Sequence, residues 1–228
     1  MKYLILIADS DEFIPMKNSL GNKVTNERSI NYMPAFDFSH NSHNCTAVCF
    51  GIGKVNAAMG AVMALNESRY DGAINTGWSG AVSKVFKGEI VVAESCVECD
   101  FDLTPVGLKQ GQKSRLETEK DYVHTTDRAL FDKISSIDGF KTGKLGTGDF
   151  FLTNKVLAEK YKSIFNINAF DMESGALAAA CRRMNTPFIS IRKISDNADD
   201  VSADTYKDAL ANDTTAFSDL ILKCLEAL

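Results

Sequence analysis

The sequence predicts an α/β fold, a single domain over residues 1–228 in which a mostly parallel, twisted mixed sheet lies between two layers of helices. Short apolar runs typical of buried strands alternate with helical segments along the whole chain. No linker rich in proline, glycine or serine interrupts this alternation, and no internal repeat is visible. The 228 residues, 45% of them hydrophobic, suffice for one large core. These features favour a three-layer α/β/α architecture.

The first half of the chain contains the clearest strand patterns. The run "KYLILIA" predicts a buried parallel strand that ends at a polar segment, and "CTAVCF" and "GAIN" predict two more. Residues 18–44 are polar with weak alternation, which indicates a hairpin or a loop region. Between the second and third strands, apolar side chains from Val55 to Leu65 recur at helical spacing, and small residues beside them allow close packing on a sheet.

The second half repeats the order of strand followed by helix. We expect strands in "GEIVVAESCVECDFD", "GKLGTGDFF" and "PFISIRKISD", and helices in "TTDRALFDKISSI" and "TNKVLAEKYKSI". The segment "INAFDMESGALAAACRRMN" changes from strand to helix. Residues 203–227 are expected to form one closing amphipathic helix.

Charge and composition argue against several classes of partner and site. A net charge of −5 gives no reason to expect nucleic acid or an anionic membrane as a partner. No apolar run approaches the roughly 18 residues of a membrane span, and the first is too short for a signal sequence, so we expect a cytoplasmic protein. The cysteines show no repeated or zinc-like spacing, which favours buried, reduced thiols over a metal or redox site: Cys45, Cys49, Cys96, Cys99, Cys181 and Cys224.

Polar residues collect where the predicted strands end. Binding sites of open α/β folds form at the carboxyl ends of the strands. Four of five such ends carry carboxylates and the other is glycine-rich: Asp9, Asp11 and Glu12 after the first, then "NTGWSG", "GDFFL", "DMES" and "SDNADD". Any one of these acids could be a helix cap or a solvated loop residue. Their coincidence at one edge of one sheet predicts a functional site there.

Two of the candidate side chains allow a structural reading as well. Glu173 is predicted one turn into an Ala-rich helix, where it could complement the helix dipole or project into a pocket. Asp196 could be held by the Ser195 hydroxyl, or could form an ion pair with Arg192 four residues earlier. No Ser/His/Asp triad is visible, and the three histidines are expected in solvated loops.

Aromatic residues stand at two of the strand ends. Of the adjacent Phe150 and Phe151, one is expected in the core, which leaves the other free to stack on a planar ring. The segment "INTGWSGAV" holds the only tryptophan, Trp78. We expect a glycine-rich turn there, a typical anion cradle in which a bulky indole is unusual.

Five segments, in order, resemble the nucleoside phosphorylase/nucleosidase superfamily, most closely its 5′-methylthioadenosine/S-adenosylhomocysteine nucleosidases. They are "GIGKVNAA", "INTGWSGAV…GEIVV", "TGDFFLTN", "FDMESGALAAAC" and "PFISIRKISDNAD". The likeness covers nearly the whole chain except residues 18–44. It implies the phosphorylase/hydrolase-like form of the fold predicted above.

The resemblance also implies roles for individual residues. Glu12 resembles the carboxylate that activates the attacking water, near Arg192, and Glu173 resembles the acceptor of the ribose hydroxyls. Asp196, steadied by Ser195, resembles the general acid that protonates the purine at N7. The further substrate-binding residues implied are Ile52, Trp78, Ser79, Gly80, Phe151, Leu152, Met172 and Tyr206.

The chemistry of the implied reaction suits these residue types. Cleavage of an N-glycosidic bond leaves positive charge on the ribose and negative charge on the purine. Carboxylates gathered around the sugar stabilise the first charge. The second needs an acid that keeps its proton near neutral pH, through burial or a neighbouring anion.

Two places in the chain depart from the family pattern. Phosphorylases carry an arginine and a serine where this chain has Asn75 and Trp78, and nucleosidases keep Ser-Ala-Gly where it has "WSG". We hypothesise that the indole fills or lids the vacated phosphate site; alternatively, it packs beneath a neighbouring helix. Glu98 and Cys99 replace an expected aromatic residue and histidine at the pocket rim.

The resemblance therefore implies a hydrolase of 5′-thio-substituted adenosines that works without metal or cofactor on a nucleoside and water. Three alternatives stay open: a phosphate-dependent nucleoside phosphorylase, a hydrolase of another nucleoside such as futalosine, and a non-catalytic nucleoside-binding protein. The resemblance also implies a homodimer, with contacts expected on the apolar helix 55–65 and the loop Phe101–Val106.

Overall fold

Four parallel strands form the centre of the sheet in the computed structural model, which describes residues 1–199, 202–212 and 216–228. The first strand, β1 (Lys2–Ile7), pairs with β4 (His43–Cys49) on one side and with β5 (Gly72–Ala81) on the other. The fourth, β10 (Phe188–Asp196), runs parallel to β5. The apolar run at the N-terminus therefore forms the buried parallel strand that its sequence predicts.

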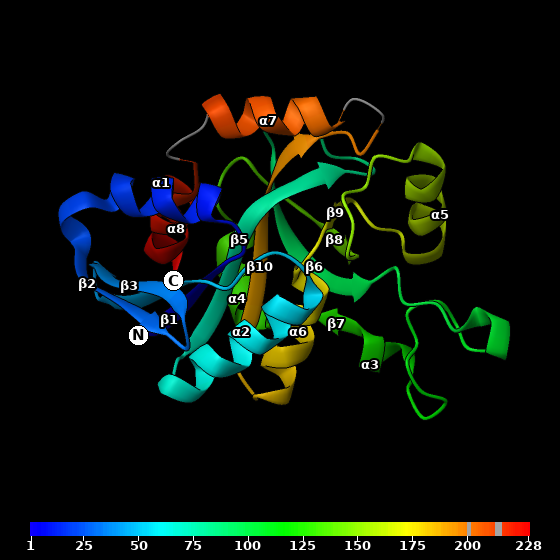
Figure 1. Ribbon diagram of the computed structural model, residues 1–228, viewed down its shortest axis with the longest axis horizontal. Helices are drawn as coiled ribbons and strands as arrows, with labels where there is room; N and C mark the ends of the chain where they lie inside the picture. The colour runs from blue at the N-terminus through cyan, green and yellow to red at the C-terminus, as the bar shows by residue number, and fades with distance from the viewer. Residues whose placement is uncertain (200–201, 213–215) are drawn as a thin grey trace.

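Half of the sheet closes on itself. Strands β6 (Ile90–Glu98), β8 (Phe140–Thr147) and β9 (Ala169–Asp171) lead from β10 round to β5, and the direct β5–β10 pairing completes the ring (Figure 1). A short strand, β7 (Val123–Thr125), adds to β6. The sequence predicts a mostly parallel, twisted mixed sheet, and it gives no sign of this closure because the closure depends on pairing between distant strands.

Residues 18–44, predicted as a hairpin or a loop region, form a hairpin for most of their length. Strands β2 (Val24–Ile30) and β3 (Met33–His40) pair antiparallel, and β3 continues the sheet beyond β4. The short helix η1 (Gly21–Lys23) leads into the hairpin.

Helices cover both faces of the sheet, as predicted. Alternate side chains of β1 point to opposite faces: Leu4 and Leu6 pack with helices α2 (Lys54–Glu67) and α6 (Ser174–Arg183). Tyr3, Ile5 and Ile7 pack with three helices on the other face, which are α1 (Ser10–Leu20), α4 (Arg128–Ser135) and α8 (Ala216–Ala227). The three-layer α/β/α arrangement is confirmed.

The remaining helices lie at the edges of these layers. Helix α7 (Ser202–Asn212) crosses the end of the sheet near the tips of β5 and β10 (Figure 1). The other three belong to the second half of the chain: η2 (Thr104–Val106), α3 (Glu119–Tyr122) and α5 (Lys155–Phe165). Among the described residues, no helix is both long and apolar enough to cross a membrane.

Two predictions about elements are wrong. The predicted closing helix over residues 203–227 is two helices, α7 and α8, and part of it (213–215) lies outside the described residues. Strand β5 does not stop after "GAIN" but continues to Ala81, because β10 and β9 pair with its second half. Trp78 therefore lies within a strand instead of a turn.

Candidate active site

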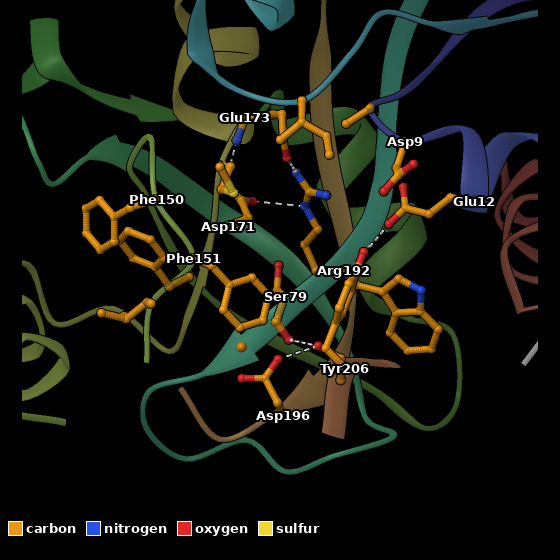
Figure 2. Close-up of a pocket in the computed structure, with 18 residues that line it drawn as sticks. Asp9, Glu12, Ser79, Phe150, Phe151, Asp171, Glu173, Arg192, Asp196 and Tyr206 are labelled. Atoms are coloured by element: carbon orange, nitrogen blue, oxygen red, sulfur yellow. Dashed lines mark hydrogen bonds and ion pairs between the residues drawn. The ribbon is translucent and has the colours of Figure 1, made fainter. Parts of the chain in front are cut away.

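A cavity of about 200 Å³ lies at the carboxyl ends of β1, β5, β9 and β10, and many of the side chains that line it are polar (Figure 2). Every site residue predicted from the sequence lines this cavity. Its walls consist of Ala8, Asp9, Glu12, Ile52, Trp78, Ser79, Gly80, Phe150, Phe151, Leu152, Phe170, Asp171, Met172, Glu173, Arg192, Ser195, Asp196 and Tyr206.

Glu12 lies in the first turn of α1 but is buried, because the helix begins at the mouth of the cavity. Its Oε1 accepts a hydrogen bond from the Trp78 backbone N–H at 2.9 Å, and its Oε2 has no partner among the described residues. Burial raises the pKa of Glu12 to about 8, although the Trp78 hydrogen bond and Arg192 act in the opposite direction. A carboxyl group with such a pKa can exchange a proton near neutral pH.

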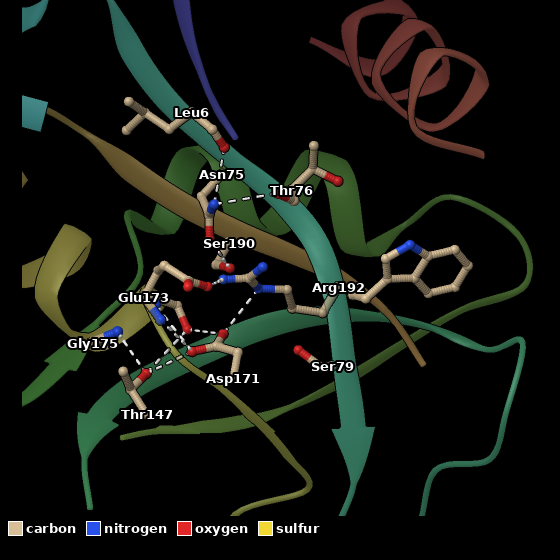
Figure 3. A network of polar contacts seen from close by, with 12 residues as sticks. Leu6, Asn75, Thr76, Ser79, Thr147, Asp171, Glu173, Gly175, Ser190 and Arg192 are labelled. Atoms are coloured by element: carbon tan, nitrogen blue, oxygen red, sulfur yellow. Dashed lines mark hydrogen bonds and ion pairs between the residues drawn. The ribbon is translucent and has the colours of Figure 1, made fainter. Parts of the chain in front are cut away.

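Arg192 holds together the acidic side of the cavity (Figure 3). Its fully buried guanidinium lies 2.9 Å from Asp171 Oδ2 through Nε and 3.4 Å from Glu173 Oε2 through Nη2. The predicted alternative, an ion pair with Asp196, is wrong, since Arg192 pairs instead with the two acids of the "DMES" segment. Gly77 makes room for this arrangement: a Cβ there would lie 2.4 Å from Arg192 Nη1.

Glu173 occupies the N-cap of α6, not its first turn as predicted. Asp171 explains the difference, because its Oδ1 accepts hydrogen bonds from the backbone N–H groups of Glu173 and Ser174, both at 3.1 Å, so the helix starts one residue later. Glu173 Oε1 accepts a hydrogen bond from the Gly53 N–H at 3.1 Å. Burial raises the pKa of Glu173, opposed by the charge of Arg192.

Asp196 lies at the opposite end of the cavity from Asp9 (Figure 2). Its Oδ2 accepts a hydrogen bond from the Ser195 hydroxyl at 2.6 Å, and its Oδ1 accepts one from the Ala198 N–H at 2.8 Å. A register shift in β10 between Ile194 and Asp196 inserts an extra residue, so Ser195 and Asp196 both line the cavity. The predicted Ser195–Asp196 hydrogen bond is confirmed.

Aromatic rings form one wall of the cavity. Phe151 is half-exposed, with its ring 5.5 Å from that of Tyr206. Phe150 packs instead on Phe170, at a centroid distance of 5.3 Å. The two neighbouring phenylalanines thus divide as the sequence predicts, one toward the core and one free to face a planar ligand.

Trp78 has two contacts that favour the packing alternative. Its ring lies edge-on to Phe217 of α8, with centroids 5.2 Å apart, and it belongs to the apolar cluster on that face of the sheet. Lys193 Nζ lies 5.4 Å from the indole centroid. The indole points away from Arg192, while the neighbouring Ser79 faces the cavity (Figure 3). The buried Ser79 hydroxyl has no hydrogen-bond partner among the described residues.

The sequence analysis assigned no role to Asp171, although it lies in the same motif as Glu173. A buried aspartate two residues before a helix is the signal that could have identified it. No feature of the sequence identified Ala8 or Phe170 as residues that line the cavity. Over the described part of the chain, no group of three or more His, Cys, Asp or Glu side chains could hold a metal ion.

Comparison with known proteins places this site in a family. The sequence profile of the phosphorylase superfamily matches residues 2–226. The chain belongs to the phosphorylase superfamily. It is 32% identical over 182 residues to the 5′-methylthioadenosine/S-adenosylhomocysteine nucleosidase of Geobacillus kaustophilus, covering 78% of this chain and 77% of that protein. It is 27% identical to the protein of the same name from Bacillus subtilis, over the full length of both.

Solved structures agree with these relatives. The nucleosidase of this name from S. pneumoniae, solved with a transition-state inhibitor, is 27% identical, with a TM-score of 0.88 over 100% of this chain and 99% of that one. A futalosine hydrolase of Helicobacter pylori shares the fold, with a TM-score of 0.91 over 100% of both chains at 20% identity. The predicted superfamily and the enzyme class, an N-glycosidic hydrolase, are confirmed.

Proposed function

We propose that this protein hydrolyses the N-glycosidic bond of adenine nucleosides of the 5′-methylthioadenosine and S-adenosylhomocysteine type, releasing adenine and the thioribose. The observation that carries the proposal is the convergence of Glu12, Glu173 and Asp196 on one cavity, although they lie far apart in the sequence. Three carboxyl groups that line one cavity suit a reaction that creates a cationic sugar.

Glu12 acts as the general base in this proposal. Its unpartnered Oε2 is free to accept a proton from a water molecule, while the Trp78 N–H fixes the other oxygen. Glu173, oriented by the Gly53 N–H and by Arg192, accepts hydrogen bonds from the ribose hydroxyls. Met172 packs against the sugar.

Asp196 acts as the general acid at the purine. The Ser195 hydroxyl fixes one of its oxygens, and the carboxyl group meets N7 of the leaving base. Phe151 stacks on the adenine with Tyr206 nearby, and backbone groups of Phe151 and Leu152 read the edge of the base. Ile52 and Gly80 complete the walls.

The surroundings of the attacking group favour water over phosphate. Asn75, which stands where phosphorylases carry an arginine, is fully buried and donates its side-chain N–H to the Leu6 carbonyl at 2.9 Å. The one guanidinium that lines the cavity within the described residues, Arg192, is already paired with Asp171 and Glu173. A phosphate dianion would find no free bidentate donor there.

Product analysis tests the proposed reaction. We expect free adenine from methylthioadenosine at equal rates with and without phosphate, and little cleavage of inosine. The Asp196→Asn variant should bind the nucleoside but release no base. Strict phosphate dependence with formation of a sugar 1-phosphate would instead identify a phosphorylase, and binding without cleavage by the wild type would identify a nucleoside-binding protein.

We further propose that the enzyme works as a homodimer in the cytoplasm. An apolar strip on α2 is exposed, with Val55 at 68% and Met59 at 52%, and it continues into Ile52 at the cavity. A second copy of the chain that bound to this strip would cover the exposed apolar surface, and it would also narrow the opening of the cavity. All six cysteines are free thiols, as is usual in a reducing compartment.

A further inference from the structure

One carboxylate in the cavity has no task in the proposed mechanism. Asp9 follows β1 directly and lines the cavity beside Glu12 (Figure 2). Asp9 is the N-cap of α1, because its Oδ1 accepts a hydrogen bond from the Asp11 N–H at 3.0 Å. The same oxygen accepts a hydrogen bond from the Ser10 hydroxyl at 3.3 Å. The Asp9 Oδ2 has no hydrogen bond, and Asp9 has no ion pair, among the described residues. Capping therefore uses only Oδ1 of Asp9 and leaves Oδ2 available to a ligand.

The charge balance around Asp9 is negative. The described lining holds five acids, and its single guanidinium, Arg192, is tied to Asp171 and Glu173. The Tyr206 hydroxyl is affected by the same negative charges: burial raises its pKa, and the charges of Glu12 and Asp9 raise the pKa further. A positive group that entered this end of the cavity would find two acceptors, the free Asp9 oxygen and the Tyr206 hydroxyl.

The order of the strands sets where Asp9 would meet a nucleoside. Asp196 ends β10, β5 lies next to it, and Asp9 follows β1 on the far side of β5. Two strand spacings separate the acids, on the order of 10 Å. With the purine at Asp196 and the ribose hydroxyls at Glu173, the end of the cavity that remains for the 5′ substituent is lined by Ala8, Asp9, Ile52 and Tyr206.

We infer that Asp9 binds an ammonium group on the 5′ substituent, so that the enzyme favours amine-bearing 5′ chains, such as that of S-adenosylhomocysteine, over the apolar methylthio group. This inference rests on the proposed function and decides between its two named substrates. A thioether sulfur donates no hydrogen bond and leaves Asp9 Oδ2 unpaired, whereas an ammonium group donates a charge-assisted one. Ala8 adds no bulk to this wall, which leaves room for a longer chain.

The test compares kcat/KM for adenine release from three nucleosides at pH 7: S-adenosylhomocysteine, 5′-amino-5′-deoxyadenosine and methylthioadenosine. The variant is Asp9→Asn, which removes the charge but keeps a good helix cap. The matched control is Asp11→Asn, which removes a charge from the exposed side of the same helix turn. Thermal melts check that both variants fold like the wild type, and Asp9→Ser replaces Asp9→Asn if that variant does not.

In the wild type we expect kcat/KM for both amines to exceed that for methylthioadenosine by about tenfold, the size of one charge-assisted hydrogen bond. Asp9→Asn should abolish this ratio, and Asp11→Asn should preserve it. A ratio that is the same in wild type and Asp9→Asn overturns the inference. If no nucleoside is cleaved, the proposed function fails, and calorimetric Kd values for the same nucleosides and variants then decide the role of Asp9 by the same ratio.

Discussion

At the scale of single residues, hydrogen bonding distinguishes two buried carboxyl groups of the site, Glu12 and Asp196. Glu12 has one oxygen fixed by a backbone N–H and the other unpartnered, and burial raises its pKa to about 8. Asp196 has both oxygens hydrogen-bonded, to Ser195 and to Ala198. The proposed base and the proposed acid therefore differ in their hydrogen-bond partners.

The raised pKa of Glu12 predicts the pH dependence of the reaction. A general base acts in its ionised form, and a pKa near 8 leaves Glu12 mostly protonated at pH 7. We expect kcat/KM to rise with pH through about 8, measured as adenine release in buffers from pH 6 to 9. Glu12→Gln should lose nearly all activity across this range. A wild-type profile that is flat between pH 7 and 9 would contradict the role of Glu12 as the base.

Gly77 gives a second prediction at this scale. A Cβ at this position would lie 2.4 Å from Arg192 Nη1 and 3.0 Å from Glu12 Oε2, and neither side chain can retreat into solvent because both are buried. We expect Gly77→Ala to lower kcat by about 100-fold or more, since small misplacements of catalytic groups are that costly.

The control for Gly77→Ala is Gly72→Ala in the same strand. A Cβ at Gly72 would make tight contacts of 3.3–3.4 Å with Tyr3 and Leu130, but neither of these side chains lines the cavity, so the activity should stay close to that of the wild type. Equal activity of the two alanine variants would show that the space at Gly77 is not needed.

At the scale of elements, the sequence predicts existence and order better than length. Local apolar patterns suffice for β1, α2 and α4, because each pattern has the period of its element. The true end of β5 depends on pairing with β10 and β9, and the bulge at Ser195 on the same pairing, so neither could be predicted from local sequence. The sequence indicated which acids lie near the cavity, because the ends of several strands can be recognised from the apolar pattern. It did not predict the Arg192–Asp171 pair, because that contact joins residues of two different strands, β10 and β9.

The docking of α8 on β5 gives a prediction about Trp78. The indole is buried against Phe217, so Trp78→Ala should lower the free energy of unfolding by about 3–5 kcal/mol, measured by urea denaturation. The exposed Phe86, changed to alanine, should cost far less. The backbone N–H that holds Glu12 survives the change, so we expect kcat to stay within about tenfold of the wild type under conditions where the variant is folded.

A second variant at this position, Trp78→Ser, tests the lid hypothesis for the indole. If the indole keeps phosphate out, Trp78→Ser should show cleavage that phosphate accelerates, with a sugar 1-phosphate among the products. Hydrolysis without any phosphate effect, combined with lower stability, would leave packing as the role of this residue.

At the scale of the whole molecule, the cavity and the exposed strip on α2 are continuous. Ile52 belongs to both, because the loop that leads from β4 into α2 also supplies the Gly53 N–H to Glu173. A change in what covers α2 should therefore reach the ribose end of the site through this short loop. The proposed dimer contact would act on the site through this loop.

Disrupting the α2 strip tests that connection. Val55 and Met59 are exposed one turn apart on the same helix, so Val55→Glu with Met59→Lys places charges in the expected dimer contact. We expect the wild type to sediment with twice the mass of one chain and the double variant to sediment as a monomer, with KM raised about tenfold or more because the mouth of the cavity stays open to water.

Val156→Glu with Lys160→Glu is the control, since these residues occupy corresponding positions on α5 and Val156 is more exposed than Val55. That variant should keep the mass and the KM of the wild type. A monomeric wild type with full activity would remove the dimer from the mechanism, because the cavity of one chain would then suffice.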